Sequence, residues 1–161
     1  MKRFGGGFAL MLRIYGFFYA LLYTLALAAY LPVYGWRILA RGRRGVNLSQ
    51  RLGRLPECLR APSDPRRVWV HAVSVGEVNA VEPLVRALLE QGCQLFMSTT
   101  TDTGQEQARR LLQKPISQGR AATFYFPVDW QWLCRRWIKR MDPQVIVIAE
   151  TELWPGFLLA S

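Results

Sequence analysis

The sequence predicts an α/β domain with a parallel sheet, preceded by a helix that anchors the chain in a membrane. A segment without any charged residue, Ile14 to Trp36, stands near the N-terminus. At about 20 residues such a segment is long enough to cross the hydrocarbon core of a bilayer. Downstream, short β-branched and apolar runs alternate with stretches of helical periodicity, which is typical of a parallel sheet covered by helices.

The anchor helix is expected within residues 1–36. Aromatic side chains that favour the membrane interface lie at its C-terminal end, at Tyr30, Tyr34 and Trp36. We expect Pro32 to end or kink the helix. A monotopic helix lying in one leaflet remains an alternative to a spanning helix, because Arg13 and Pro32 limit the uncharged and unbroken span.

Positive charge is concentrated beside this segment. The net charge of the 161 residues is +10, and residues 1–60 hold 10 Lys and Arg against the single acid Glu57, whereas residues 61–161 hold 11 against 10 acids. A protein that binds nucleic acid would carry the excess on its folded domain, so this class is disfavoured. Basic residues next to an apolar segment favour anionic lipids and, by the positive-inside rule, a cytoplasmic domain.

A cleaved signal peptide is the main alternative to an anchor, and it would release a secreted or periplasmic domain. Lys2 and Arg3 resemble an n-region, and Ala26 to Ala28 resembles a cleavage site. The arginines that follow would resist translocation. The cysteines, Cys58, Cys93 and Cys134, are odd in number and far apart, which favours a reducing compartment; with a single histidine they predict no zinc site.

The domain is expected over residues 68–161, after a basic linker, 37–67, with one short helical turn near Ser49 to Leu55. Four runs are expected to be strands: Val68–Val75, Gln94–Ser98, Ala122–Phe126 and Val145–Ala149. Helices are expected between them, ending at Gly92, Leu112 and Met141, the last of which is opened by Asp129. This order implies a Rossmann-like sheet with helices on both faces. The chain stops at Ser161 as another helix opens, so we expect it to be a truncated piece of a longer protein.

Three segments are expected at the carboxyl ends of the strands, where ligands bind in open parallel sheets. They are Ser74 to Glu77, Thr99 to Gly104 and Glu150 to Trp154. Neither a GxGxxG fingerprint nor a P-loop occurs, which disfavours dinucleotide enzymes and P-loop NTPases. The hydroxyls of Ser74, Thr100 and Thr103 have no Ser-His-Asp pattern around them.

Glu77 has two interpretations. Its carboxylate either complements a helix N-terminus or acts as a general base that takes a proton from an acceptor hydroxyl, with Gly76 allowing a substrate close to the backbone. The helix end stabilises the carboxylate and weakens it as a base, so burial or a nearby acid would have to compensate. Glu150 is a candidate for that acid and is otherwise a loop acid or a cap.

The other candidates favour structural roles. His71, the single histidine, lies inside the first strand and is expected to be hydrogen-bonded within the structure. Large indole side chains more often pack in a core or an interface than form a stacking platform. We therefore expect packing roles for Trp130, Trp132, Trp137 and Trp154.

Taken together, these segments resemble Kdo transferases, membrane-bound glycosyltransferases that add 3-deoxy-D-manno-octulosonic acid (Kdo) to the lipid A precursor in Gram-negative bacteria. Besides the apolar helix, the resemblance rests on Arg41 to Arg44, Arg51-Leu52-Gly53, His71 to Glu77 (HAVSVGE), Thr99 to Gly104, Phe126-Pro127-Val128-Asp129 and Glu150 to Pro155 (ETELWP). Asp102 stands where proline is common in the family, and Gly156 where asparagine is common.

The resemblance implies a glycosyltransferase-B fold of two Rossmann-like domains, of which this chain holds the N-terminal, acceptor-side one. It implies that Glu77 is the general base, that Glu150 supports the transition state, and that Kdo is transferred from CMP-Kdo to lipid IVA with inversion. CMP-Kdo is then held mainly by a C-terminal domain, so this fragment alone is expected to be inactive. No cofactor or metal is implied.

Acceptor contacts are accordingly expected at Ser74, Gly76, Arg41, Arg43 and Arg44. The arginines would hold a phosphorylated lipid head group near the bilayer, although positive-inside topology explains them equally well. The expected partners are the lipid A precursor and anionic lipids, at the cytoplasmic face of the bacterial inner membrane. A non-enzymatic, membrane-tethered α/β binding module is the alternative function.

Overall fold

The computed structural model describes residues 6–41, 48–54, 66–149 and 154–161. Its elements in chain order are α1 Gly6–Arg41, α2 Leu48–Arg51, β1 Arg67–His71, α3 Val75–Glu90, β2 Gln94–Thr99, α4 Asp102–Leu111, α5 Gln113–Ser117, β3 Ala121–Tyr125, α6 Gln131–Met141, β4 Val145–Ile148 and α7 Pro155–Leu158. All four expected strands are present. The first is shorter than expected because Ser74 is already the N-cap of α3, and the short helix α5 was not expected.

The four strands form one parallel sheet in the order β3-β2-β1-β4. Strand β1 is central and pairs with both β2 and β4, so that His71 lies opposite Ser98 on one side and Ile148 on the other. Because the strands are parallel, their carboxyl ends share one edge of the sheet. The expected parallel α/β fold is confirmed.

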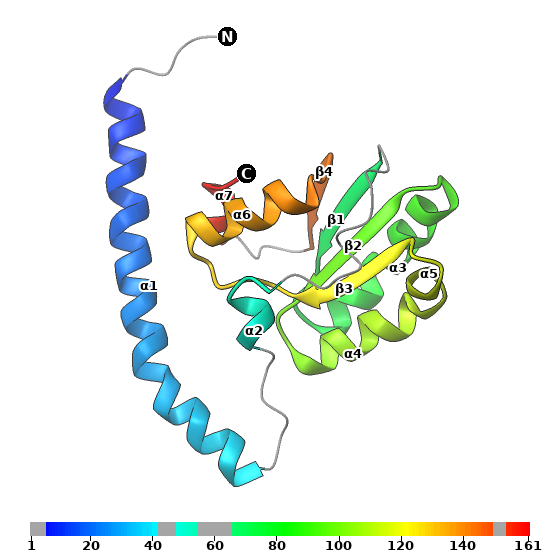
Figure 1. Ribbon diagram of the computed structural model, residues 1–161, viewed down its shortest axis with the longest axis horizontal. Coiled ribbons are helices and arrows are strands. Elements are labelled where there is room, and N and C mark those ends of the chain that lie inside the picture. Colours follow the sequence, from blue (N-terminus) through cyan, green and yellow to red (C-terminus); the bar gives the residue numbers. More distant parts are fainter. Residues whose placement is uncertain (1–5, 42–47, 55–65, 150–153) are drawn as a thin grey trace.

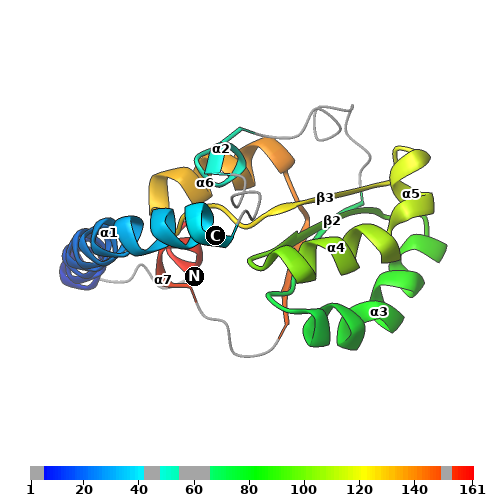
Figure 2. The ribbon, with the colours of Figure 1, turned by 90° about the horizontal axis from the view of Figure 1, so that it is seen from below.

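Helices cover both faces of this sheet (Figure 2). Alternate residues of β1 point to opposite faces, and they separate two buried clusters. Trp69 belongs to the cluster under α6 and α7, where Trp137 stacks on Phe124 at 4.9 Å between ring centroids. Val68 and Val70 belong to the cluster under α3 and α4. Trp137 thus packs as expected, whereas Trp132 is 59% exposed and does not join a core.

The apolar N-terminal helix is present as α1, and its Leu10–Val33 segment of 24 residues has a mean hydropathy of 1.7, long and apolar enough to cross a membrane. The helix continues through Pro32 to Arg41, so of the two expected outcomes at the proline, an end or a kink, the end is wrong. Figure 1 shows that α1 instead bends in its C-terminal part, as helices do where a proline removes a backbone hydrogen bond.

Helix α1 docks on the α/β domain through the middle of its apolar segment. The hydroxyl of Tyr19 donates to Asp129 Oδ2 at 2.8 Å, and the indole Nε1 of Trp130 donates to Thr24 Oγ1 at 3.0 Å. Tyr23 and Leu27 pack against the cluster under α6 and α7. The helix and the domain therefore share an interface rather than only a covalent connection.

The sequence suggested that Asp129 opens α6, but the structure shows that it does not. Trp130 is the N-cap of α6 and makes no side-chain cap bond. The Asp129 carboxylate instead accepts from the backbone N–H groups of Gly156 at 2.9 Å and Phe157 at 2.7 Å, at the start of α7. Burial raises the pKa of Asp129, while these bonds and that from Tyr19 act in the opposite direction. Asp129 therefore caps α7, which is distant in the sequence, and not the adjacent helix α6.

We expect Gly156→Ala to lower the free energy of unfolding by about 2–4 kcal/mol. A Cβ at this position would lie 2.2 Å from the backbone oxygen of Asp129, and a backbone atom in the core cannot move aside cheaply. Chemical denaturation of the variant in detergent would measure the change. Gly35→Ala is the matched control, because a Cβ there has nothing within 4 Å; equal stability of the two variants would contradict this packing.

Candidate active site

The candidate site is built from loops that leave the common carboxyl edge of the sheet. The first loop connects β1 to α3, the second connects β2 to α4, and the third leads from β3 to α6. The structure therefore brings together two of the three segments that the sequence analysis singled out. Glu150 and the rest of segment 150–153 lie outside the described residues, as do Arg43, Arg44 and the side chain of Arg41.

Glu77 is held at the start of α3 by its own loop. Its Oε2 accepts from the backbone N–H of Val73 at 2.8 Å, and its Oε1 accepts from the Ser74 hydroxyl at 2.9 Å. Ser74 Oγ in turn accepts from the Glu77 N–H at 3.3 Å. This is a variant of the capping box in which the acid reaches the residue before the cap. The geometry satisfies the capping interpretation of Glu77.

The same geometry leaves the Glu77 carboxylate able to accept a further hydrogen bond. Each of its oxygens has two lone pairs and accepts only one hydrogen bond, from Val73 or from Ser74, and these two bonds fix the side chain in one orientation. The residue is 7% exposed, while its neighbour Gly76 is exposed. A Cβ at Gly76 would meet no protein atom closer than Ser74 Oγ at 3.8 Å, so the backbone here is open to a ligand.

Val73 connects the first loop to the second. Its carbonyl oxygen accepts from Thr101 Oγ1 at 2.9 Å, and Thr101 is the N-cap of α4, whose side chain accepts from the Gly104 N–H at 3.1 Å. Gly104 permits this approach, since a Cβ there would lie 2.9 Å from the Val73 oxygen. The N-termini of α3 and α4 consequently lie side by side, and their partial positive charges favour anionic groups at this edge.

A third group at this edge was not singled out as a site by the sequence analysis. The guanidinium of Arg51 donates from Nη2 to the Thr100 carbonyl at 2.5 Å and lies 5.2 Å from the centre of the Tyr125 ring. Tyr125 donates to Asp102 Oδ1 at 2.8 Å. Burial, and then Asp102, raise the pKa of Tyr125 to about 12. The signal for this group in the sequence was the Arg51-Leu52-Gly53 motif. Its glycine adopts a positive φ of 110° two residues after the end of α2, a conformation that favours glycine.

His71 is hydrogen-bonded within the sheet beneath this site, as expected. Its Nδ1 lies 2.9 Å from Ser98 Oγ and 3.1 Å from the Ser98 carbonyl oxygen, and its ring stacks on Phe126 at 4.1 Å. Burial lowers the pKa of His71 to about 4, while the hydrogen bond to Ser98 and the charge of Glu77 act in the opposite direction. The imidazole is therefore neutral at pH 7.

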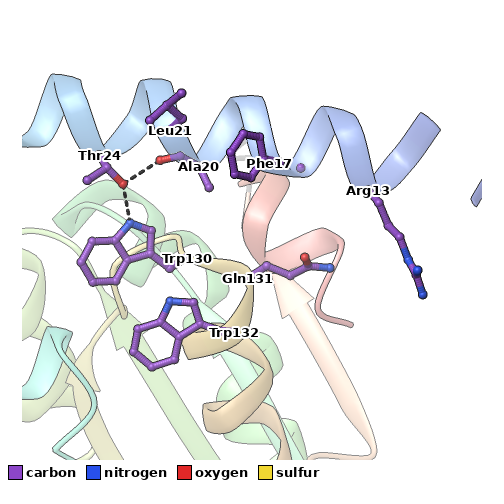
Figure 3. Close-up of a pocket in the computed structure, with 9 residues that line it drawn as sticks. Arg13, Phe17, Ala20, Leu21, Thr24, Trp130, Gln131 and Trp132 are labelled. Atoms are coloured by element: carbon purple, nitrogen blue, oxygen red, sulfur yellow. Dashed lines mark hydrogen bonds between the residues drawn. The ribbon is translucent and has the colours of Figure 1, made fainter. Parts of the chain in front are cut away.

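A separate groove lies between α1 and the start of α6 (Figure 3). Its volume is about 660 Å³. It is lined by Arg13, Gly16, Phe17, Ala20, Leu21, Thr24, Trp130, Gln131 and Trp132. It contains neither Glu77 nor any other carboxylate, so it does not belong to the candidate active site. Among the described residues, no group of three or more His, Cys, Asp or Glu side chains is placed to hold a metal ion.

Comparison with known proteins gives a family for these features. Residues 46–161 match the family model of 3-deoxy-D-manno-octulosonic-acid transferase (Kdo transferase). A 3-deoxy-D-manno-octulosonic acid transferase of Bordetella pertussis is 37% identical over 148 residues, which are 86% of this chain and 33% of the relative. One from Haemophilus influenzae is 33% identical over 96 residues, 58% of this chain and 21% of the relative.

A bifunctional glycosyltransferase/methyltransferase of Fusobacterium nucleatum is also similar, with 33% identity over 96 residues, or 59% of this chain and 14% of the relative. The chain thus spans a third or less of the length of these curated relatives.

We expect the chain to lose stability between pH 7 and pH 5 through His71. Its pKa is lower in the folded state, about 4, than the usual value near 6.5, so the unfolded state binds more protons in this range. The loss at pH 5 relative to pH 7 should be about 2 kcal/mol. Denaturant titrations at the two pH values would measure it.

His71→Gln is the control for this pH dependence, because the chain has a single histidine. The variant should be less stable at pH 7 and should not lose stability between pH 7 and pH 5, because the raised pKa of Asp129 acts in the opposite direction. An equal loss in the variant and the parent chain would show that another group is responsible.

Proposed function

The chain belongs to the 3-deoxy-D-manno-octulosonic-acid transferase family, and we propose that it forms the acceptor-side domain of an enzyme that transfers Kdo from CMP-Kdo to lipid IVA. In this proposal residues 1–36 are the anchor, residues 37–67 a basic linker and residues 68–161 the acceptor-side Rossmann-like domain. The donor, CMP-Kdo, binds mainly to a second domain in the part of the relatives that this chain does not span. The present residues alone are then inactive.

The position of Glu77 is the observation that carries the proposal. The carboxylate stands at the carboxyl edge of the sheet, next to exposed backbone at Gly76, and Val73 and Ser74 hold it in one orientation. A general base must be presented to its proton donor in a fixed geometry. A sugar hydroxyl of the acceptor, placed over Gly76, would meet Glu77 within hydrogen-bonding reach.

The proposed reaction is a single displacement at the anomeric carbon of Kdo. Glu77 takes the proton of the acceptor hydroxyl while its oxygen forms the new bond to the anomeric carbon, and the bond from that carbon to the CMP phosphate breaks on the opposite side. CMP leaves with the bonding electron pair, so the configuration inverts. No metal or cofactor takes part in the proton transfer.

In this proposal Glu77 serves both as the cap of α3 and as the proton acceptor, because its hydrogen bonds to Val73 and Ser74 hold it in place. The bound acceptor excludes water from the carboxylate, and Glu150 is the neighbouring acid that supports the transition state. The alternative is a membrane-tethered binding module in which Glu77 is only a cap, and the same capping bonds favour it. The Glu77→Gln assay below distinguishes this alternative from the enzyme.

The proposal places the lipid-borne acceptor and the domain at one membrane surface. Arg41, Arg43 and Arg44 would hold the phosphorylated head group while Ser74 and Gly76 contact its sugar. The surplus of positive charge in residues 1–60 supports an anionic membrane surface, which we place at the cytoplasmic side of the inner membrane. The near balance of charge in residues 61–161 gives no support for nucleic acid as a partner.

Glu77→Gln should lower kcat for Kdo transfer about 100-fold or more, because general-base catalysis contributes factors of this size. The assay would use a chimera in which residues 1–161 replace the corresponding part of the Bordetella pertussis relative. The amide oxygen of glutamine would still accept from the Val73 N–H, so the fold should survive, and thermal denaturation would verify this.

Glu82→Gln is the matched control for this assay. Glu82 is also on α3 but forms an exposed ion pair with Arg86 at 2.6 Å, and kcat should stay within about 2-fold of the parent because such pairs contribute little. Near-normal turnover by a folded Glu77→Gln protein would leave Glu77 as a cap alone and favour the binding module.

Gly76→Ala should raise the KM for the lipid acceptor about 10-fold or more without destabilising the fold, since a lost close contact of about 1.4 kcal/mol corresponds to that factor. The added methyl group meets no protein atom within 3.8 Å and removes a helical glycine, so the melting temperature should stay constant or rise. The KM for CMP-Kdo is the internal control and should not change. An unchanged acceptor KM would place the acceptor away from this backbone.

A further inference from the structure

One face of helix α1 packs against the α/β domain. Gly16, Tyr19, Ala20, Tyr23 and Leu27 are the partly buried residues in the middle of its apolar segment. They recur at the three- and four-residue spacing that places side chains on one helical face. At Gly16 the approach is close, since a Cβ would lie 3.3 Å from the Leu159 side chain.

The opposite face is apolar and uncovered. With about 100° of rotation per residue, Met11, Phe18 and Leu25 fall on the side of α1 away from the domain. They are 63%, 56% and 58% exposed. Ile14 and Leu22, on the same side, are 50% and 66% exposed. The single charge of the segment, Arg13, lies instead on the domain side, where it lines the groove with Trp130 and Trp132 (Figure 3).

This division conflicts with a helix that crosses the bilayer. The docked residues, from Gly16 to Leu27, cover about 17 Å of helix at 1.5 Å per residue, in the middle of a segment that would fill a hydrocarbon core of about 30 Å. If α1 spanned, the domain would lie beside it at that depth. Figure 1 shows α6 running crosswise away from α1, and α6 carries four exposed basic residues: Arg135, Arg136, Lys139 and Arg140.

Charged side chains and the polar surface of a water-soluble α/β domain are excluded from hydrocarbon. A spanning helix would therefore have to detach from the domain and break the hydrogen bonds of Tyr19 to Asp129 and of Trp130 to Thr24. A helix lying in the plane of the membrane keeps both bonds and buries its uncovered face in lipid.

We propose that α1 lies in the plane of one leaflet of an anionic bilayer, with the face of Met11, Phe18 and Leu25 inserted and the α/β domain resting on the opposite face. Trp132, beside α1 and 59% exposed, then lies at the interface that indole rings prefer. Arg13 reaches the phosphate layer from the domain side. The arrangement rests on the membrane attachment within the proposed function and is independent of the role of Glu77.

The experiment measures the depth of three positions that share one face of α1. Met11→Cys, Phe18→Cys and Leu25→Cys proteins are labelled with a bimane fluorophore and bound to vesicles of phosphatidylethanolamine and phosphatidylglycerol. Quenching by lipids brominated at shallow or deep acyl positions reports the depth of each label. The parent chain, treated in the same way, gives the contribution of Cys58, Cys93 and Cys134. None of the three substituted side chains packs in the domain, so folding is not at risk.

An in-plane helix predicts the same depth for all three labels. A spanning helix would place Met11 and Leu25, about 21 Å apart along the axis, near opposite interfaces and Phe18 at the centre of the bilayer. That graded pattern would overturn the proposal. If the protein neither co-sediments with the vesicles nor shows quenching, membrane attachment itself fails, whereas the kinetic test of Glu77 is unaffected.

Ala20→Cys supplies a matched control. Ala20 is two residues from Phe18 but about 160° away around the helix, on the face that meets the domain. The in-plane arrangement predicts at least 5-fold weaker quenching at Ala20 than at Phe18 by the deep bromolipid. Equal quenching at the two positions would show that both faces meet lipid and that the domain is not docked on α1 in the membrane.

Discussion

The Asp129 carboxylate holds together parts of the chain that are far apart in the sequence. It accepts from Tyr19 in α1 and from the backbone of Gly156 and Phe157 at the start of α7, and it is 1% exposed. A buried carboxylate is costly unless its oxygens are satisfied, so removing one partner weakens the arrangement of the others. Helix α1, the start of α7 and, through the Cys134 thiol at 3.8 Å, helix α6 all contact this group.

The candidate active site depends on a similar connection at Val73. The backbone N–H of this residue holds Glu77, and its carbonyl oxygen holds the cap of α4 through Thr101. The first two loops therefore form one rigid unit at the sheet edge, and the orientation of the carboxylate does not depend on a mobile side chain. Such rigidity fits the proposed role of Glu77 as a base, because the acceptor and not the base would then have to be positioned.

Docking of α1 on the domain relates these two features. The hydrogen bond from Tyr19 and the packing of Tyr23 and Leu27 set the side of the domain that faces the helix. In the proposed in-plane arrangement the exposed apolar face of α1 faces lipid, and an acceptor embedded in the same leaflet would reach the domain without leaving the membrane. The search for its sugar would then be restricted to a layer along the bilayer surface.

Local patterns in the sequence determined the apolar helix, the four strands, their parallel direction with helices on both faces, and the Ser74 to Glu77 capping segment. Each follows from the spacing of apolar residues or from a cap and its partner within a few positions. The cap that Asp129 provides for α7 and the place of Arg51 over Tyr125 come from partners tens of residues distant. Only the tertiary structure decided them, because a buried group takes whichever partner the fold brings close, and periodicity carries no information about that partner.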